Sequence, residues 1–185
     1  MNPLLVYIVG PPGVGKTAVM AELTAGCRRV AASKPIGHES LLNRRGLVGI
    51  ELGLRREAFS GTDALAMNAQ PAASAWIQTR PHDLLLAEGA RLATAGFLYG
   101  VRASGYRVAI IQLTVPEEVL EARRAERGSD QDPRWMRGAT TRAQRICQRM
   151  ALDANVWPVS ALASPTEIAD QIWRFEPQLE VLKDA

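Results

Sequence analysis

A glycine-rich stretch near the amino terminus constrains this chain more than any other feature. Gly10-Pro11-Pro12-Gly13-Val14-Gly15-Lys16-Thr17 satisfies the pattern G-x-x-x-x-G-K-[ST] in full and directly follows the apolar run Leu4–Val9. The pattern needs a strand before it and a helix after it, because backbone N–H groups and the helix dipole then converge on phosphate oxygens. Residues 17–27 carry helix formers, so both conditions are met. The sequence therefore predicts a nucleoside triphosphate site.

Within this stretch two side chains have specific expected roles. Lys16 is expected to reach the β- and γ-phosphates of ATP, and the Thr17 hydroxyl to bind Mg²⁺. The six residues before them (Gly10, Pro11, Pro12, Gly13, Val14 and Gly15) are expected to bind the nucleotide through their backbone. The alternative, a glycine-rich turn that binds nothing, does not account for the strand and the helix that flank it.

Further apolar runs alternate with helical patterns along the chain. Buried strands are expected at 84–87, 107–115 and 156–159, with helices between them. This alternation predicts an α/β, three-layer P-loop fold: a mainly parallel, five-stranded sheet with helices on both faces, in one domain covering 1–185. Residues 29–33 and 47–54 are candidates for a further strand each, or together for a hairpin-like insertion.

Composition excludes several classes of protein. With 185 residues, 47% hydrophobic and 22% charged, the chain has the average composition of a globular domain, not of a disordered one. Its two cysteines, Cys27 and Cys147, fit neither a disulfide scaffold nor a zinc module. The run Leu4–Val9 is too short for a signal peptide or a membrane span, so a cytoplasmic protein without a membrane partner is expected.

The motifs that mark other P-loop classes are missing. The chain has no N-K-x-D tetrad and no D-x-x-G after a strand, which argues against a GTPase, and it has no room for the second subdomain of an AAA machine. P-loop chains of this length resemble small kinases. In such folds the ligand binds at the carboxyl ends of the strands.

An acid ends the apolar strand at 84–87, in the place of the Walker B motif. Glu88 is followed by Gly89, where small kinases usually carry Asp-Gly, so its longer side chain is a departure from their pattern. Glu88 is expected to hold Mg²⁺ or to orient the acceptor hydroxyl, the alternative being an acidic helix cap. Arg91 could reach the acceptor or a phosphate, or be an ordinary surface arginine.

The positive charge of the chain is concentrated in one segment. Residues 123–149 hold eight arginines and three acids, whereas the rest of the chain is slightly negative. Arg123 and Arg127 share one helix face and resemble the beginning of the lid in nucleotide and gluconate-type kinases, with the lid at about 123–142. We expect them to act on the transferring phosphate, with Arg123 also at the adenine, and Arg134 and Arg137 to bind substrate. A solvated basic face is the alternative.

The acceptor is expected to bind around a small, polar segment. Ser60, Thr62 and Asp63 can offer hydroxyls and a carboxylate, and Asp63 is the best candidate for the general base. The same letters also fit a plain capping box. His38 is a weaker candidate, and the general base is left open between Asp63, Glu88 and His38. Arg55 and Arg56 are further candidates for binding the acceptor.

Two runs of sequence point to a narrower family. L-G-L-R-R-E-A-F-S-G-T-D-A-L-A-M from Leu52, and P-H-D-L-L-L-A-E-G-A-R-L-A from Pro81, resemble the P-loop kinases of bacteriophage DNA hypermodification. The resemblance implies ATP-dependent phosphorylation of the hydroxymethyl group of 5-hydroxymethyluracil in DNA, in the host cytoplasm. It also implies that Lys16, Thr17, Asp63 and Glu88 are the chemical residues.

Two other functions stay open on the sequence alone. One is a kinase of a small molecule, such as a nucleoside, a nucleotide, a sugar acid or an antibiotic. The other is a P-loop ATPase that has no phosphate acceptor. The arginines at 123 and beyond favour phosphoryl transfer more strongly than they favour a DNA acceptor.

Overall fold

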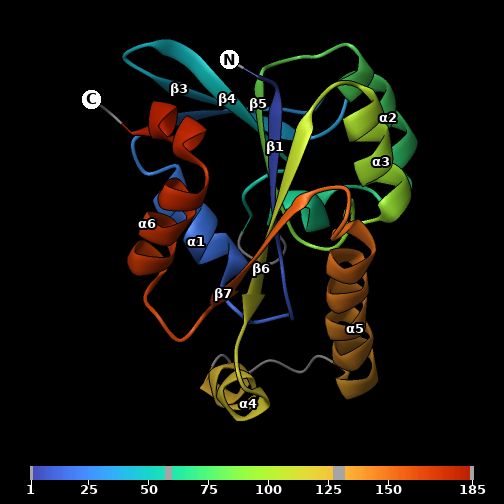
Figure 1. The fold of residues 1–185 in the computed structure, drawn as a ribbon, viewed down its shortest axis with the longest axis vertical. Coiled ribbons are helices and arrows are strands. Elements are labelled where there is room, and N and C mark those ends of the chain that lie inside the picture. The colour runs from blue at the N-terminus through green and yellow to red at the C-terminus, as the bar shows by residue number, and fades with distance from the viewer. Residues whose placement is uncertain (1, 57–59, 127–131, 184–185) are drawn as a thin grey trace.

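A computed structural model describes residues 2–56, 60–126 and 132–183. Its centre is one seven-stranded sheet in the order β2-β3-β4-β5-β1-β6-β7 (Figure 1). The strands are β1 (Leu4–Val9), β2 (Arg28–Ala32), β3 (His38–Asn43), β4 (Gly46–Leu52), β5 (Leu84–Glu88), β6 (Arg107–Thr114) and β7 (Asn155–Ser160). Five neighbouring strands, from β4 to β7 in the sheet order, are parallel, which confirms the α/β fold with a mainly parallel sheet.

The predicted number of five strands is wrong. Strands β2 and β3 form an antiparallel hairpin that adds to the edge of the sheet beside β4. Both candidates at 29–33 and 47–54 are therefore strands, β2 and β4, and β3 between them had no expectation at all. The hairpin lies at an edge where most of β2 is exposed, so its sequence carries little of the apolar pattern that marks buried strands.

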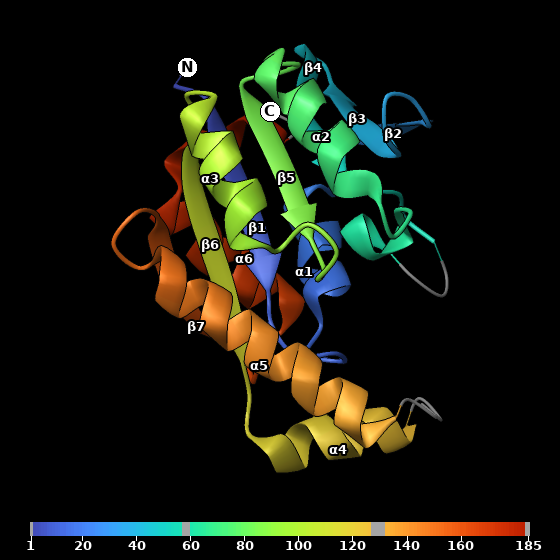
Figure 2. The ribbon, with the colours of Figure 1, turned by 90° about the vertical axis from the view of Figure 1, so that its right-hand side faces the viewer.

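Helices cover both faces of the sheet, and their bounds are close to those expected. They are α1 (Lys16–Leu23), α2 (Ala69–Gln78), α3 (Ala95–Ala103), α4 (Glu117–Glu126), α5 (Pro133–Met150) and α6 (Pro165–Phe175), with short 3₁₀ helices η1 (Gly61–Ala64) and η2 (Pro177–Leu182). Figure 1 shows α1 and α6 on one face, α2, α3 and α5 on the other, and α4 beyond the carboxyl end of the sheet. Figure 2 shows α5 running obliquely across its face.

Each face of the sheet has its own apolar core. Alternate residues of β1 point to opposite faces, so Leu4, Val6 and Ile8 pack with α1 and α6, whereas Leu5 and Tyr7 pack with α2 and α3. Every residue of β1 and β5 is buried, and each fully buried Leu or Ile contributes about 1.5–3 kcal/mol relative to an exposed one. The two cores fix β1 and β5 rigidly, and these strands carry the P-loop and Glu88.

Local signals set the ends of the helices next to the site. The predicted capping box at Ser164 and Glu167 is confirmed at the start of α6. Helix α3 was expected from residue 91 but begins at Ala95, because the Thr94 side chain accepts a hydrogen bond from the Phe97 amide. Residues 89–94 are thereby left free to form a turn at the end of β5. No helix among residues 2–56, 60–126 and 132–183 has both the length and the apolar character to cross a membrane.

Candidate active site

The P-loop connects β1 to α1 and is shaped by close backbone contacts. A Cβ atom at Gly10 would stand 2.7 Å from the carbonyl oxygen of Leu113, so only glycine fits there. Gly15 caps α1 with a φ of 104°, in the left-handed region that favours glycine. The ammonium of Lys16 donates to the carbonyl oxygens of Gly10 at 3.2 Å and Pro11 at 3.0 Å. The cation is thus held over the loop to which phosphates bind.

The second half of the site is an interaction between α1 and β5. The Thr17 hydroxyl donates a 2.8 Å hydrogen bond to Oε1 of Glu88, the last residue of β5. Burial raises the pKa of the Glu88 carboxyl to about 7, against the opposing effects of the Thr17 hydrogen bond and the Lys16 charge. Burial lowers the pKa of Lys16, while Glu88 and Asp63 oppose that shift. The two strands therefore place a cation and a carboxyl of perturbed acidity at one end of the sheet.

The Thr17 and Glu88 oxygens suit Mg²⁺ in the form in which it accompanies a nucleotide. Mg²⁺ prefers oxygen ligands and commonly takes only one or two from the protein, the rest coming from phosphates and water. Within the described part of the chain no three His, Cys, Asp or Glu side chains gather as a metal site. The adjacent hydroxyl and carboxylate of Thr17 and Glu88 supply the oxygens that a nucleotide-bound Mg²⁺ requires.

Helix η1 is fastened to the end of β5 by hydrogen bonds. Oδ1 of Asp63 accepts from the amides of Ala90 at 2.8 Å and Arg91 at 3.0 Å. Asp63 thus caps the turn after β5, whereas the expected alternative was a cap on its own segment. The Thr62 hydroxyl donates to the Glu88 carbonyl oxygen at 2.9 Å and lies 3.1 Å from the Tyr7 hydroxyl. Since Thr62 is 0% exposed, it positions Glu88 and does not face a bound acceptor as expected.

Glycines make this close approach possible. A Cβ atom at Gly61 would stand 2.7 Å from the Glu88 carboxylate, and one at Gly89 would stand 2.9 Å from Oδ2 of Asp63. Both glycines have positive φ, 61° and 105°. The segments Ser60-Gly61-Thr62-Asp63 and Glu88-Gly89 therefore form one unit, in which each supplies a glycine to receive the other's side chain.

Two arginines of α4 lie over the P-loop. Arg123 donates to the carbonyl oxygens of Val14 at 3.4 Å and Ala161 at 2.8 Å, and so joins the P-loop to the turn after β7. Arg124, which sequence reasoning missed, has its Cγ 3.6 Å from where a Cβ at Gly13 would stand. Its Nε is buried without a partner, while Nη1 contacts Glu117. Arg127 lies outside the described residues.

The remaining expected residues are not all gathered at this site. His38 is buried, its ring 4.5 Å from that of Trp76, with Nδ1 2.9 Å from the Ile36 carbonyl oxygen, so burial separates it from a bound acceptor. Arg55, Arg56 and Ser60 flank the site on the segment between β4 and η1, where the Arg56 amide donates to the Ser60 hydroxyl. Exposed Arg134 and Arg137 begin α5, on the β7 side of the P-loop.

A buried charged cluster beside the site was missed as well. Arg29 of β2 donates to Glu39 of β3, to Glu51 of β4 and to the Thr24 hydroxyl. Burial raises the pKa of Glu51, against the effect of Arg29, and the charge of Glu51 adds to the upward shift at Glu88. An acid inside the apolar run of β4 was the one signal of this cluster in the sequence. Because Arg29 satisfies both acids, the cluster anchors the hairpin to β4.

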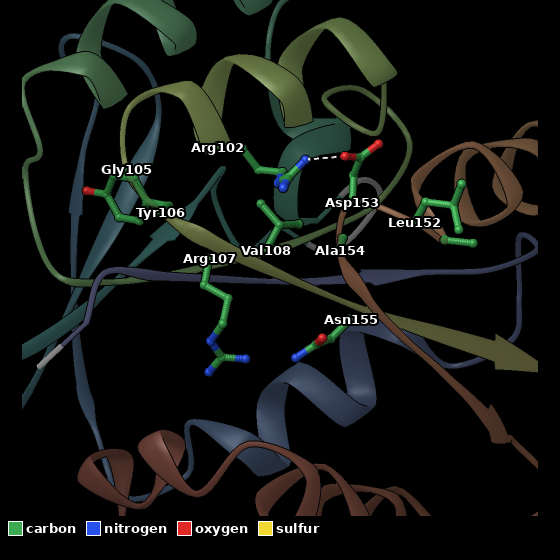
Figure 3. A pocket seen from close by; sticks show the side chains of 10 residues that line it. Arg102, Gly105, Tyr106, Arg107, Val108, Leu152, Asp153, Ala154 and Asn155 are labelled. Carbon is green, nitrogen blue, oxygen red and sulfur yellow. Dashed lines mark hydrogen bonds and ion pairs between the residues drawn. The ribbon is translucent and has the colours of Figure 1, made fainter.

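A cavity of about 530 Å³ lies at the other end of the sheet, where β6 and β7 begin (Figure 3). Among its lining residues, Arg102 and Asp153 form a 2.7 Å ion pair, and Arg107 is held by Glu176 at 2.6 Å. Its charged groups are therefore already paired. The cavity shares no lining residue with the P-loop or with Glu88.

Comparison with known proteins supports the assignment of the fold and the nucleotide site. No curated protein matches the chain. A solved structure of a sugar kinase from Janibacter sp. HTCC2649 is similar, with a TM-score of 0.52, 12% identity, and 99% of each chain covered. A gluconokinase from Sinorhizobium meliloti 1021 matches with a TM-score of 0.46 and 14% identity, over 98% of this chain and 92% of that one. At such identities, similarity concerns the fold alone.

The family comparison covers most of the chain. The model of the family described as P-loop Nucleotide Kinase3 matches residues 1–164, which include the P-loop, Asp63, Glu88 and both arginines of α4. The fold and the site agree with this match, because a complete phosphate-binding loop lies beside a hydroxyl and a carboxylate suited to Mg²⁺. The chain therefore belongs to the P-loop Nucleotide Kinase3 family.

Proposed function

We propose that this kinase transfers the γ-phosphate of ATP to a hydroxyl group of an acceptor that binds at the carboxyl ends of β4 and β5. The observation that carries the proposal is the pairing of Thr17 with Glu88 at 2.8 Å, next to a Lys16 ammonium held over the P-loop. Phosphoryl transfer needs little covalent chemistry from the protein, because positioning and charge stabilisation supply most of the catalysis. The site provides both.

The nucleotide half of the site is assigned residue by residue. The P-loop amides and Lys16 hold the phosphates, and Thr17 and Glu88 hold Mg²⁺, which supplies charge neutralisation between the phosphates when it is bound. Arg123 and Arg124 reach the P-loop from α4, where a guanidinium can stabilise the charge of the transferring group. We extend the proposal to the predicted arrangement of one domain over 1–185 with a lid at about 123–142.

The acceptor half is assigned to the unit formed by η1 and the turn after β5. Asp63 uses Oδ1 to hold that turn, which leaves Oδ2 to accept a hydrogen bond from the acceptor hydroxyl. Glu88 is the second candidate for this role, since a carboxyl with a pKa of about 7 can exchange a proton near neutral pH. Buried His38 is the weakest of the three.

A small molecule is the acceptor class that we place first. The acceptor end of the site is bounded by tightly fastened segments, and one solved structure of similar fold is described as a sugar kinase. Small hydroxyl compounds such as sugars, sugar acids and nucleosides are therefore the first acceptors to test.

A second candidate is the hydroxymethyl group of 5-hydroxymethyluracil in DNA. One observation favours it: five arginines of α5 are exposed, and this helix contains no acid. They are Arg134, Arg137, Arg142, Arg145 and Arg149. Several cations along one exposed helix suit the phosphate backbone of a nucleic acid. Arg55 and Arg56, on the other side of the P-loop, would add to such a surface.

The experiment is transfer of labelled γ-phosphate from ATP to a panel of acceptors. The panel holds sugars, sugar acids, nucleosides, nucleotides and oligonucleotides with or without 5-hydroxymethyluracil. Label on a small acceptor supports the first candidate, and label on modified DNA alone supports the second. ATP hydrolysis at an equal rate with and without every acceptor favours the remaining alternative, an ATPase without an acceptor, and contradicts the proposal.

A further inference from the structure

The side chain of Arg91 is a cation at the acceptor end of the site that the described part of the chain leaves without an acidic partner. None of the ion pairs formed by residues 2–56, 60–126 and 132–183 includes Arg91. Its Nη1 contacts the thioether of Met67, its Nη2 lies 3.4 Å from the Asp63 carbonyl oxygen, and its Nε is buried without a hydrogen-bond partner. These are weak acceptors for a guanidinium, which forms its strongest hydrogen bonds with carboxylates and phosphates.

The backbone of Arg91 is fixed although its side chain is weakly bound. Oδ1 of Asp63 accepts from the Arg91 amide at 3.0 Å and from the Ala90 amide at 2.8 Å. The Asp63 carboxylate is therefore engaged with backbone amides and not with the guanidinium. Arg91 is only three residues after Glu88, so this anchoring sets the cation beside the carboxyl that faces Thr17.

The surface around Arg91 is uncharged. Its exposed neighbours are Ala66, Met67, Asn68 and Ala90, and Met67 is 84% exposed. A lone, partly buried cation in neutral surroundings costs desolvation that an ordinary salt bridge would offset. A ligand with a negative group would provide that missing partner and would bind by a charge-assisted, potentially bidentate contact.

We propose that Arg91 forms an anion subsite for the acceptor, so that the kinase prefers a hydroxyl compound that also carries a carboxylate or a phosphate. The subsite rests on the proposed function for its catalytic meaning, because it selects among acceptors of the same reaction. Met67 lies beside the bound anion and contacts the apolar part of the acceptor. Arg91 is thus a specificity residue at the acceptor end, distinct from the arginines of α4 over the P-loop.

The test compares acceptors that differ only in an anionic group. Matched pairs are D-gluconate with D-glucose, thymidine 5′-monophosphate with thymidine, and 5-hydroxymethyl-2′-deoxyuridine 5′-monophosphate with its nucleoside. Where a pair is phosphorylated, we expect kcat/KM to be about 10- to 100-fold higher for the anionic member, as a hydrogen bond to a charged group allows. Arg91→Gln should remove this preference mainly through the KM of the acceptor, with the KM of ATP unchanged.

Two further variants separate the charge of Arg91 from a general structural effect. Arg91→Lys keeps the charge but loses the planar fork, so it should retain part of the preference. Arg28→Gln removes an exposed arginine at the far, amino-terminal end of β2 and should change nothing. Which pair responds distinguishes a carboxylate from a phosphate as the anion.

Binding is measured as well, so that the subsite can be tested without turnover. The same pairs are titrated calorimetrically into protein saturated with a non-hydrolysable ATP analogue. Tighter binding of the anionic member that Arg91→Gln abolishes supports the subsite even if no acceptor is phosphorylated, in which case only the proposed function fails. Phosphorylation without an anion preference overturns the subsite alone. Absence of any Arg91-dependent preference in both assays also overturns it.

Discussion

Gly61 approaches Glu88 so closely that a Cβ atom at Gly61 would stand 2.7 Å from the carboxylate oxygen Oε1. The same Cβ would stand 2.6 Å from the Glu88 carbonyl oxygen. Because Oε1 also accepts the hydrogen bond of Thr17, the acceptor segment at η1 and the nucleotide loop share one carboxyl group. The position of Glu88 therefore depends on both halves of the site.

Gly61→Ala should displace η1 from β5 and disturb Glu88. The new methyl group meets backbone and a buried carboxylate that cannot yield, and φ is 61°, so we expect a loss of about 1–3 kcal/mol in the free energy of unfolding. The matched control is Gly46→Ala, where φ is 93° but nothing lies within 4 Å of the added Cβ. Urea denaturation compares the two variants. Equal losses would show that backbone strain alone is responsible and that the close approach does not matter.

The stability of the nucleotide-free protein should fall as pH rises. Burial raises the pKa of Glu88 from 4.5 to about 7, so the folded protein binds this proton more tightly than the unfolded chain does. The contribution is fully present below about pH 4.5 and is lost as pH passes about 7. Relative to Glu88→Gln, the wild type should lose up to about 3 kcal/mol of unfolding free energy between these values.

That comparison is made by urea denaturation in the presence of EDTA, which keeps Mg²⁺ away from the carboxylate. The Gln variant keeps an oxygen that can accept from Thr17 but does not titrate, so it corrects for every other ionisable group. Parallel pH profiles for the two proteins would mean that Glu88 titrates at an ordinary pKa.

The two carboxyl groups should differ in what their loss affects. Asp63→Asn keeps an oxygen for the Ala90 and Arg91 amides, so the fold should survive while the rate of transfer falls about 100-fold or more, with little change in Mg²⁺ dependence. Glu88→Gln should instead raise the Mg²⁺ concentration needed for half-maximal rate. Steady-state kinetics over a Mg²⁺ series measures both. Normal turnover in the Asp63 variant would leave that carboxylate as a cap only.

Arg124→Gln should slow phosphoryl transfer. Its Nε is buried without a partner beside the P-loop, where it can meet the charge that spreads over the γ-phosphate, and such donors are worth about 100-fold in kcat. Glu117→Gln is the control, because it removes the partner of Arg124 but leaves the guanidinium in place, and exposed ion pairs contribute little. Equal effects of the two variants on kcat would contradict a direct role for Arg124.

The sequence predicted the parts of the site that lie next to each other along the chain. The P-loop carries its own signature, and Glu88 stands where a buried strand ends, so both could be found from pattern and position. The parallel strands followed in the same way from continuous apolar runs. These features are local, and the strands β1 and β5 that carry them are buried on both faces, which is what makes their pattern clear.

What the sequence did not reveal depends on contacts between distant segments. Thr62 is a hydroxyl in a polar segment by its letters, and only the fold shows that Tyr7 and the Glu88 carbonyl enclose it. His38 looked available, yet Trp76 covers it from α2. Strand β3 begins with charged and polar residues because Arg29 pairs with its glutamate, so apolar periodicity had nothing to detect. Burial of a polar group by a remote partner leaves no local signal.

The most direct test of the central claim is the transfer of labelled γ-phosphate from ATP to a hydroxyl acceptor, measured together with total ATP consumption. The account predicts label on an acceptor, ATP consumption that rises when this acceptor is added, and loss of both in Lys16→Ala, whose ammonium lies over the P-loop. Label transfer that persists in Lys16→Ala, or ATP consumption at full rate without any acceptor, would contradict it.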